Sequence, residues 1–133
     1  ESTGQIQRLT EVVNEAPDSV SVFCGCDSLA FESFAAGACG WISMAANFAP
    51  VDCAELFQAV FQEKEYEKAR AIYKRILPLL NLLESFPKPV QANKYILKKY
   101  CGIESGFVRR PRLELNQEEK DYIDSIAGAI QFQ

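Results

Sequence analysis

Only two segments of this chain have the pattern of β-strands, and both lie within its first 44 residues. Residues 20–23 and 41–44 are short, β-prone apolar runs, and each follows a segment with helical spacing. The resulting order of helix, strand, helix and strand, with short connections, predicts parallel strands joined by right-handed crossovers. The sequence therefore predicts an α/β fold whose sheet portion is confined to the beginning of this chain.

Two parallel strands do not make an independent sheet, because their outer edges stay unpaired and their faces need cover. Both candidate strands are apolar, as if buried on both sides. We therefore expect this chain to be part of a larger α/β protein whose other strands lie elsewhere. Ligands of such proteins bind at the carboxyl ends of the strands, which here are the corners near Gly25 and Ile42.

Helical spacing of apolar residues accounts for most of the remaining chain. The first predicted helices flank the strands at residues 6–15 and 28–36, with Asp27 or Ser28 as the N-cap of the second. After residue 50 the pattern is entirely helical, with predicted helices at residues 52–62, 65–83, 90–100 and 117–130. Pro78 is expected to kink the second of these, and Asn116 to cap the last. We accordingly divide the chain into residues 1–62 and 63–133.

Composition excludes several classes of protein. The 133 residues suffice for one domain, and the net charge of −4 does not suit a nucleic-acid surface. A solvated loop or an ion-pair site is the expected role of the basic stretch at residues 109–112, with an anion site as the alternative. No run is long enough to span a membrane, and the polar start resembles no signal peptide, which predicts a cytoplasmic protein.

The chain has no histidine and five cysteines, which limits its chemistry. Catalytic triads of the Ser-His-Asp or Cys-His type are excluded. Cys24 and Cys26 have the wrong spacing for structural zinc and no second pair, so we expect reduced thiols, no metal and no cofactor. A thiol-dependent enzyme that uses Cys26 is an alternative, although no nearby cation would populate its thiolate.

Several short motifs, in order along essentially the whole chain, resemble the dihydrodipicolinate synthase / N-acetylneuraminate lyase family. They are Glu1-Ser2-Thr3-Gly4, Gly25-Cys26-Asp27-Ser28, Gly37-Ala38-Cys39-Gly40-Trp41-Ile42-Ser43, Ala46-Asn47, Lys88-Pro89-Val90 and Arg112-Leu113. Each motif alone is weakly specific, whereas their order and spacing together are quite specific.

The resemblance implies the C-terminal part of a (β/α)8 TIM barrel followed by a C-terminal helical extension. Residues 20–25 would be the seventh strand, residues 40–44 the eighth, and the extension would start near residue 64. Members of this family are class I lyases or aldolases that form a Schiff base between a lysine and pyruvate or another 2-oxo acid. That lysine would immediately precede Glu1, so no catalytic residue is expected within this chain.

The resemblance also implies a pocket wall within the chain. The substrate-binding residues expected from it are Gly25, Asp27, Ile42, Ser43, Met44 and Thr3. Three positions have a structural alternative: Asp27 as a helix N-cap, Thr3 as part of a turn, and Trp41 as a packing residue rather than a substrate contact. The residue without a side chain, Gly25, would let a substrate approach the backbone.

Departures from the family's synthase pattern concern the substrate. Cys26 replaces the first of two acidic residues, and residues 40–42 and 108–113 look closer to branches that act on sugar-derived or hydroxyproline-derived 2-oxo acids. The expected partners are a pyruvate-like 2-oxo acid and further copies of the chain in a dimer or tetramer. A non-catalytic half-barrel that assembles with a partner chain is the alternative.

Overall fold

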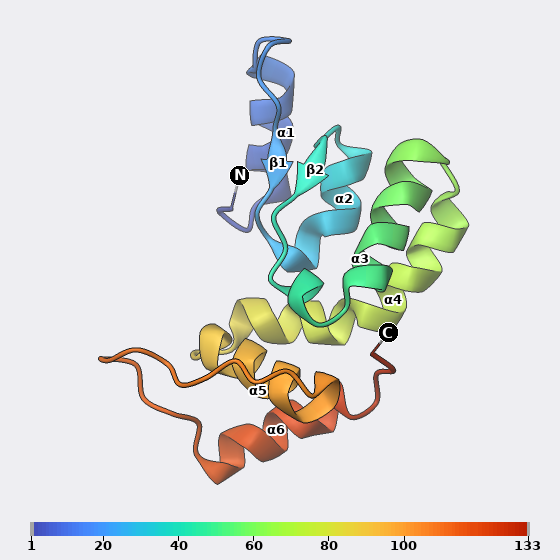
Figure 1. Ribbon diagram of the computed structural model, residues 1–133. Helices are drawn as coiled ribbons and strands as arrows, with labels where there is room; N and C mark the ends of the chain where they lie inside the picture. Colours follow the sequence, from blue (N-terminus) through green and yellow to red (C-terminus); the bar gives the residue numbers. More distant parts are fainter. Residues whose placement is uncertain (1, 133) are drawn as a thin grey trace.

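The computed structural model describes residues 2–132 and places both strands near the N-terminus, as Figure 1 shows. Helix α1 comes first, and β1 leads through the 3-10 helix η1 into α2, which is followed by β2. The bounds of these elements are α1 Ile6–Glu15, β1 Phe23–Cys24, η1 Asp27–Leu29, α2 Ala30–Ala35 and β2 Gly40–Trp41. The predicted alternation of helix and strand is thus present, and the predicted helix at residues 28–36 begins with a 3-10 turn.

The two strands pair in parallel, with Phe23 opposite Gly40 and Cys24 opposite Trp41. Bonds of 2.9 Å from Cys39 N to Val22 O and from Ile42 N to Cys24 O extend the ladder at both ends. The regular strands are therefore displaced by one to three residues from the predicted runs. Gly40 pairs with Phe23, whose ring lies over it, so an added Cβ would come within 2.3 Å of Cε1.

One face of the strand pair is covered and the other is open. Cys24 and Cys26 are buried, whereas Phe23 is 42% and Ile42 is 71% exposed. The apolar strands suggested burial on both faces within a larger protein, and within residues 2–132 the helices cover only one side of the pair. The open face, which carries Phe23, Gly25 and Ile42, is where further strands of a barrel would enclose an interior.

The rest of the chain is helical. A 3-10 helix, η2 (Ala45–Asn47), leads into α3, which ends in the π-helical turn η3 (Gln58–Gln62), and three longer helices follow. Their bounds are α3 Pro50–Phe57, α4 Tyr66–Ser85, α5 Pro89–Cys101 and α6 Gln117–Ala127. The structure confirms these predicted helices, with the last ending three residues earlier than expected. No helix within residues 2–132 is long and apolar enough to cross a bilayer.

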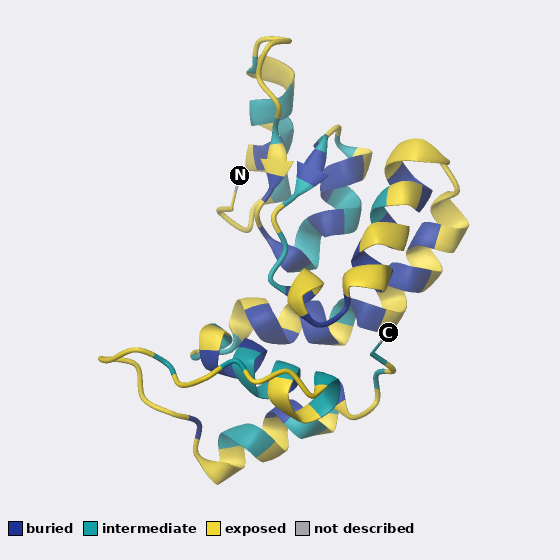
Figure 2. Cartoon of the chain, in the orientation of Figure 1, coloured by how far each residue is buried: buried dark blue, intermediate teal, exposed yellow. Residues whose placement is uncertain are grey.

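Helix α4 is the central element of the fold. Its first half runs beside α3, and its second half lies across the ends of the two strands and contacts α5 and α6 (Figure 1). Pro78 lies inside this helix, and α4 changes direction along its length as the sequence predicted. Its buried residues include Ile76, Leu79 and Leu80, and Figure 2 shows the buried sides of α3 and α4 facing each other.

Two polar features hold the last helix in place. Asn116 accepts a bond from Glu119 N and Glu119 accepts one from Asn116 N, which is a complete capping box, as predicted. Asp124 accepts bonds from Tyr95 and Tyr100 of α5, at 2.9 and 2.8 Å. The division at residues 62 and 63 stays a prediction, since one apolar core extends across it.

Candidate functional site

The carboxyl ends of β1 and β2 form one corner of the molecule. Continuing the strand register places Gly25 opposite Ile42, and both are on the open face. Ser43 and Met44 follow directly and are half-buried. Four of the six predicted site residues therefore lie together at the place where α/β proteins bind ligands.

Asp27 ties the two strand ends to each other. Its carboxylate is buried, with 3% of the residue exposed, and it accepts a bond of 2.7 Å from Ser43 Oγ. The backbone N–H of Met44 donates to the same carboxylate, at 3.2 Å from Oδ1 and 3.1 Å from Oδ2. The prediction of Asp27 or Ser28 as an N-cap is wrong, because neither η1 nor α2 has a side-chain cap. The carboxylate instead bonds to the neighbouring strand end.

The environment of Asp27 opposes its ionisation. Burial raises the pKa of its carboxyl, hydrogen bonds from Ser43 and Met44 lower it, and the nearby charge of Glu84 raises it further. The net pKa lies above the ordinary value because desolvation is the largest of these effects. Asp27 is therefore a buried acid whose charge is stabilised mainly by the hydrogen bonds from Ser43 and Met44.

The thiols near this corner are poor nucleophiles. Burial raises the pKa of Cys53 to about 12, and its Sγ lies 3.9 Å from Ser43 Oγ. Burial also raises the pKa of Cys26, with Ser28 opposing and Glu84 adding to the shift. All five cysteines are free, as expected, and the thiolate of Cys26 is disfavoured at neutral pH. This environment argues against the thiol-dependent alternative.

Two residues of the later helices also reach the corner, and sequence reasoning missed both. Glu84 of α4 accepts a hydrogen bond from the backbone N–H of Asp27. Asn93 of α5 is buried, with 8% exposed, and its Nδ2 donates to Met44 O at 2.9 Å. In the sequence, the only indication of a role for Asn93 was its position as a polar residue next to the apolar face of its helix.

The two remaining candidates, Thr3 and Trp41, are not part of the group of side chains around Asp27. Thr3 is exposed in the segment before α1, and Glu1 of the same motif lies outside the described residues. Trp41 packs against the core with its ring edge-on to Phe34, at 6.2 Å between centroids. The packing alternative for Trp41 therefore holds.

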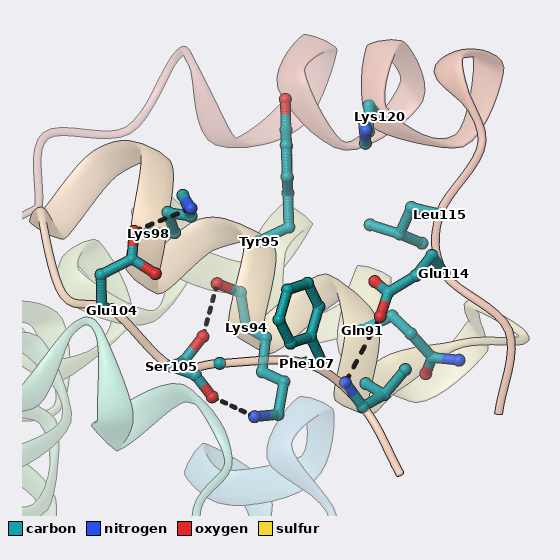
Figure 3. A pocket seen from close by; sticks show the side chains of 12 residues that line it. Gln91, Lys94, Tyr95, Lys98, Glu104, Ser105, Phe107, Glu114, Leu115 and Lys120 are labelled. Atoms are coloured by element: carbon teal, nitrogen blue, oxygen red, sulfur yellow. Dashed lines mark hydrogen bonds and ion pairs between the residues drawn. The ribbon is translucent and has the colours of Figure 1, made fainter. Parts of the chain in front are cut away.

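A separate cavity of about 420 Å³ lies between α5, α6 and the segment that joins them. Figure 3 shows its charged side chains largely occupied by internal contacts: Lys98 pairs with Glu104 at 2.7 Å, and Lys94 donates to Ser105 O. Nothing in this cavity belongs to the strand ends. A cavity of about 300 Å³ adjoins the corner instead, and both Met44 and Asn93 line it.

Comparison with known proteins identifies the family. The family model described as the dihydrodipicolinate synthetase family matches residues 1–130. The 4-hydroxy-tetrahydrodipicolinate synthase of Listeria monocytogenes is 36% identical over 130 residues, which are 98% of this chain and 43% of that protein. The chain thus spans less than half the length of this relative.

Solved structures agree with this assignment. A Pseudomonas aeruginosa protein described as a dihydrodipicolinate synthetase has a TM-score of 0.84 and 37% identity, over 97% of this chain and 43% of that one. The dihydrodipicolinate synthase of Aquifex aeolicus has a TM-score of 0.84 and 29% identity, over 100% of this chain and 45% of that one. The predicted fold class, the C-terminal part of a TIM barrel with a helical extension, is confirmed. By sequence and by fold, this chain belongs to the dihydrodipicolinate synthetase family.

Proposed function

We propose that this chain forms one wall of the active site of a class I lyase that acts on pyruvate or a related 2-oxo acid. The observation that supports this most is the corner where Gly25, Ile42, Ser43 and Met44 meet at the carboxyl ends of two parallel strands. The family of this chain and the synthases related to it point in the same direction.

The reactive group in this proposal is a lysine immediately before Glu1. Its amine attacks the 2-oxo carbon, loses water and forms an imine that accepts electrons from the adjacent bond. No lysine of this chain is assigned that role. The proposed substrate-binding residues are Gly25, Asp27, Ile42, Ser43, Met44 and Thr3, with the buried Asp27 acting through the strand ends that it joins.

The surroundings of the site fit a small organic acid. The exposed Gly25 leaves the backbone accessible, and the Ser43 hydroxyl and the Ile42 side chain offer a polar and an apolar contact beside it. A dimer or tetramer and a cytoplasmic location are part of this proposal. The acceptor, whether of the synthase type or derived from a sugar acid or hydroxyproline, would be found with a panel of substrates.

Borohydride trapping tests the proposal. The protein with all the residues that its gene encodes is incubated with pyruvate, reduced, and measured by intact mass. We expect a stable adduct with the mass of one pyruvate, less one water and plus two hydrogens, on the residue before Glu1. Reduction without pyruvate is the control. A folded protein that forms no adduct would refute the lyase proposal and favour the non-catalytic half-barrel.

A further inference from the structure

We propose that Asn93 and Glu84, from the helical extension, are positioning residues that hold the two strand ends of the pocket wall in place. This inference rests on the function proposed above. The two helices that carry these side chains belong to the extension and not to the barrel. Asn93 is 49 residues from Met44 along the chain, and Glu84 is 57 residues from Asp27.

Asn93 anchors the end of β2. Its side-chain amide donates to Met44 O at 2.9 Å, while Met44 N donates to Asp27. The backbone of Met44 is therefore held on both its N–H and its carbonyl side. Asn47 also donates to Met44 O, at 2.8 Å, but it lies only three residues away and moves with the same loop. Asn93 therefore ties the end of β2 to α5.

Glu84 anchors the end of β1. Its carboxylate accepts the backbone N–H of Asp27, the residue whose side chain bonds to Ser43 and Met44. Glu84 is exposed, and it also interacts with Cys26, the residue before Asp27. The two anchors thus meet at Asp27 and Met44, which are directly bonded to each other. A displacement of α4 or α5 would move both strand ends.

Two amides on α5 allow a matched comparison. Gln91 is as buried as Asn93, with 6% exposed, and its Nε2 donates to Leu113 O at 2.8 Å. Both residues are amides that bond to a backbone carbonyl, but only Asn93 reaches the strand ends. Asn93→Ala and Gln91→Ala therefore remove similar hydrogen bonds from similar surroundings.

The first readout is catalysis. We expect Asn93→Ala to lower kcat for the proposed reaction about 10-fold, since a wall displaced by a fraction of an ångström misorients the substrate. Gln91→Ala should lose similar thermal stability and keep its kcat. Equal kcat in the two variants, measured well below their melting temperatures, would overturn the role of Asn93.

The exposed position of Glu84 gives a second pair of variants that are expected to fold. Glu84→Ala removes the acceptor for Asp27 N–H, whereas Glu84→Gln keeps an acceptor oxygen without the charge. We expect Glu84→Ala to lower kcat severalfold and Glu84→Gln to retain most of it. Equal losses in both variants would assign the effect to charge and contradict positioning.

Hydrogen exchange gives a readout that does not require activity. In Asn93→Ala, amides of residues 43–48 should exchange at least severalfold faster than in the wild type, while in Gln91→Ala the faster exchange should appear near residues 111–115. Unchanged exchange at residues 43–48 in Asn93→Ala would refute the anchor. A wild type that forms no pyruvate adduct would instead refute the proposed function, and the exchange result would still decide the anchoring.

Discussion

The buried carboxylate of Asp27 gives the sharpest test of how the strand ends are held. Asp27→Ala removes the acceptor for Ser43 Oγ and Met44 N. Hydrogen bonds to a charged group each contribute about 1.5–3 kcal/mol, and removing the buried carboxylate recovers part of its desolvation cost. We therefore expect a net loss of about 3 kcal/mol, equivalent to a fall of about 10 °C in Tm.

Asp27→Asn separates charge from hydrogen bonding. The amide keeps the size of the side chain and one acceptor oxygen, so we expect a change within about 1 kcal/mol at pH 7. Because burial raises the pKa of Asp27 in the folded state, the native protein binds a proton more readily than the unfolded chain. The wild type therefore loses stability as pH rises from about 4 through the raised native pKa.

The assay is denaturant unfolding of the wild type and both variants between pH 4 and pH 7.5. The stability of Asp27→Asn relative to the wild type should increase as pH rises through this window. A loss below about 1 kcal/mol in Asp27→Ala would contradict the importance of the two hydrogen bonds. Parallel pH profiles for the wild type and Asp27→Asn would show that burial does not shift the titration of Asp27.

Four further substitutions test other parts of the fold by denaturant unfolding. Arg75→Ala should lower the free energy of unfolding by about 2 kcal/mol, because it leaves the carboxylate of Asp52 without its cation. That carboxylate is only 1% exposed, and burial already raises its pKa. Asp52→Asn should lower the free energy of unfolding by less, and equal losses in the two variants would contradict the pairing. Asn116→Ala should cost about 1 kcal/mol and speed hydrogen exchange at the start of α6, and unchanged exchange there would refute the capping box. Asp124→Asn should cost about 1–2 kcal/mol at pH 7. Burial acts to raise the pKa of Asp124, but hydrogen bonds from Lys99, Tyr100 and Tyr95 lower it overall. The stability lost in Asp124→Asn should therefore shrink as pH falls below about 4. A loss of stability that does not depend on pH would contradict the lowered pKa.

The sequence predicted features that depend on neighbours along the chain. Helical spacing located α4 and α5 within one or two residues, and Asn116 was identified as a cap because its partner is three residues away. The corner of Gly25 and Ile42 also followed from local pattern. Each of these depends on short-range geometry that one sequence contains.

Contacts between distant segments were not predictable in the same way. Asp27 has the residue type of an N-cap at the start of a helix, but Ser43 and Met44, just after the next strand, provide the donors that it binds. Asn93 and Glu84 are ordinary polar residues of amphipathic helices until the bend of α4 brings them to the strand ends. Strand bounds depend on the partner strand as well: Phe23 pairs with Gly40, whose added Cβ would come within 2.3 Å of the Phe23 ring.

The bonds from Glu84 and Asn93 to the strand ends also bear on the order in which the protein folds. The partners of these two bonds are separated by 49 and 57 positions along the chain. We expect such contacts to form late, because a long loop must close first. During synthesis on a ribosome, both strands would emerge well before α4 and α5, so the strand ends would at first lack the bonds from Glu84 and Asn93. We therefore expect the pocket wall to reach its final shape only after α4 and α5 have folded onto it.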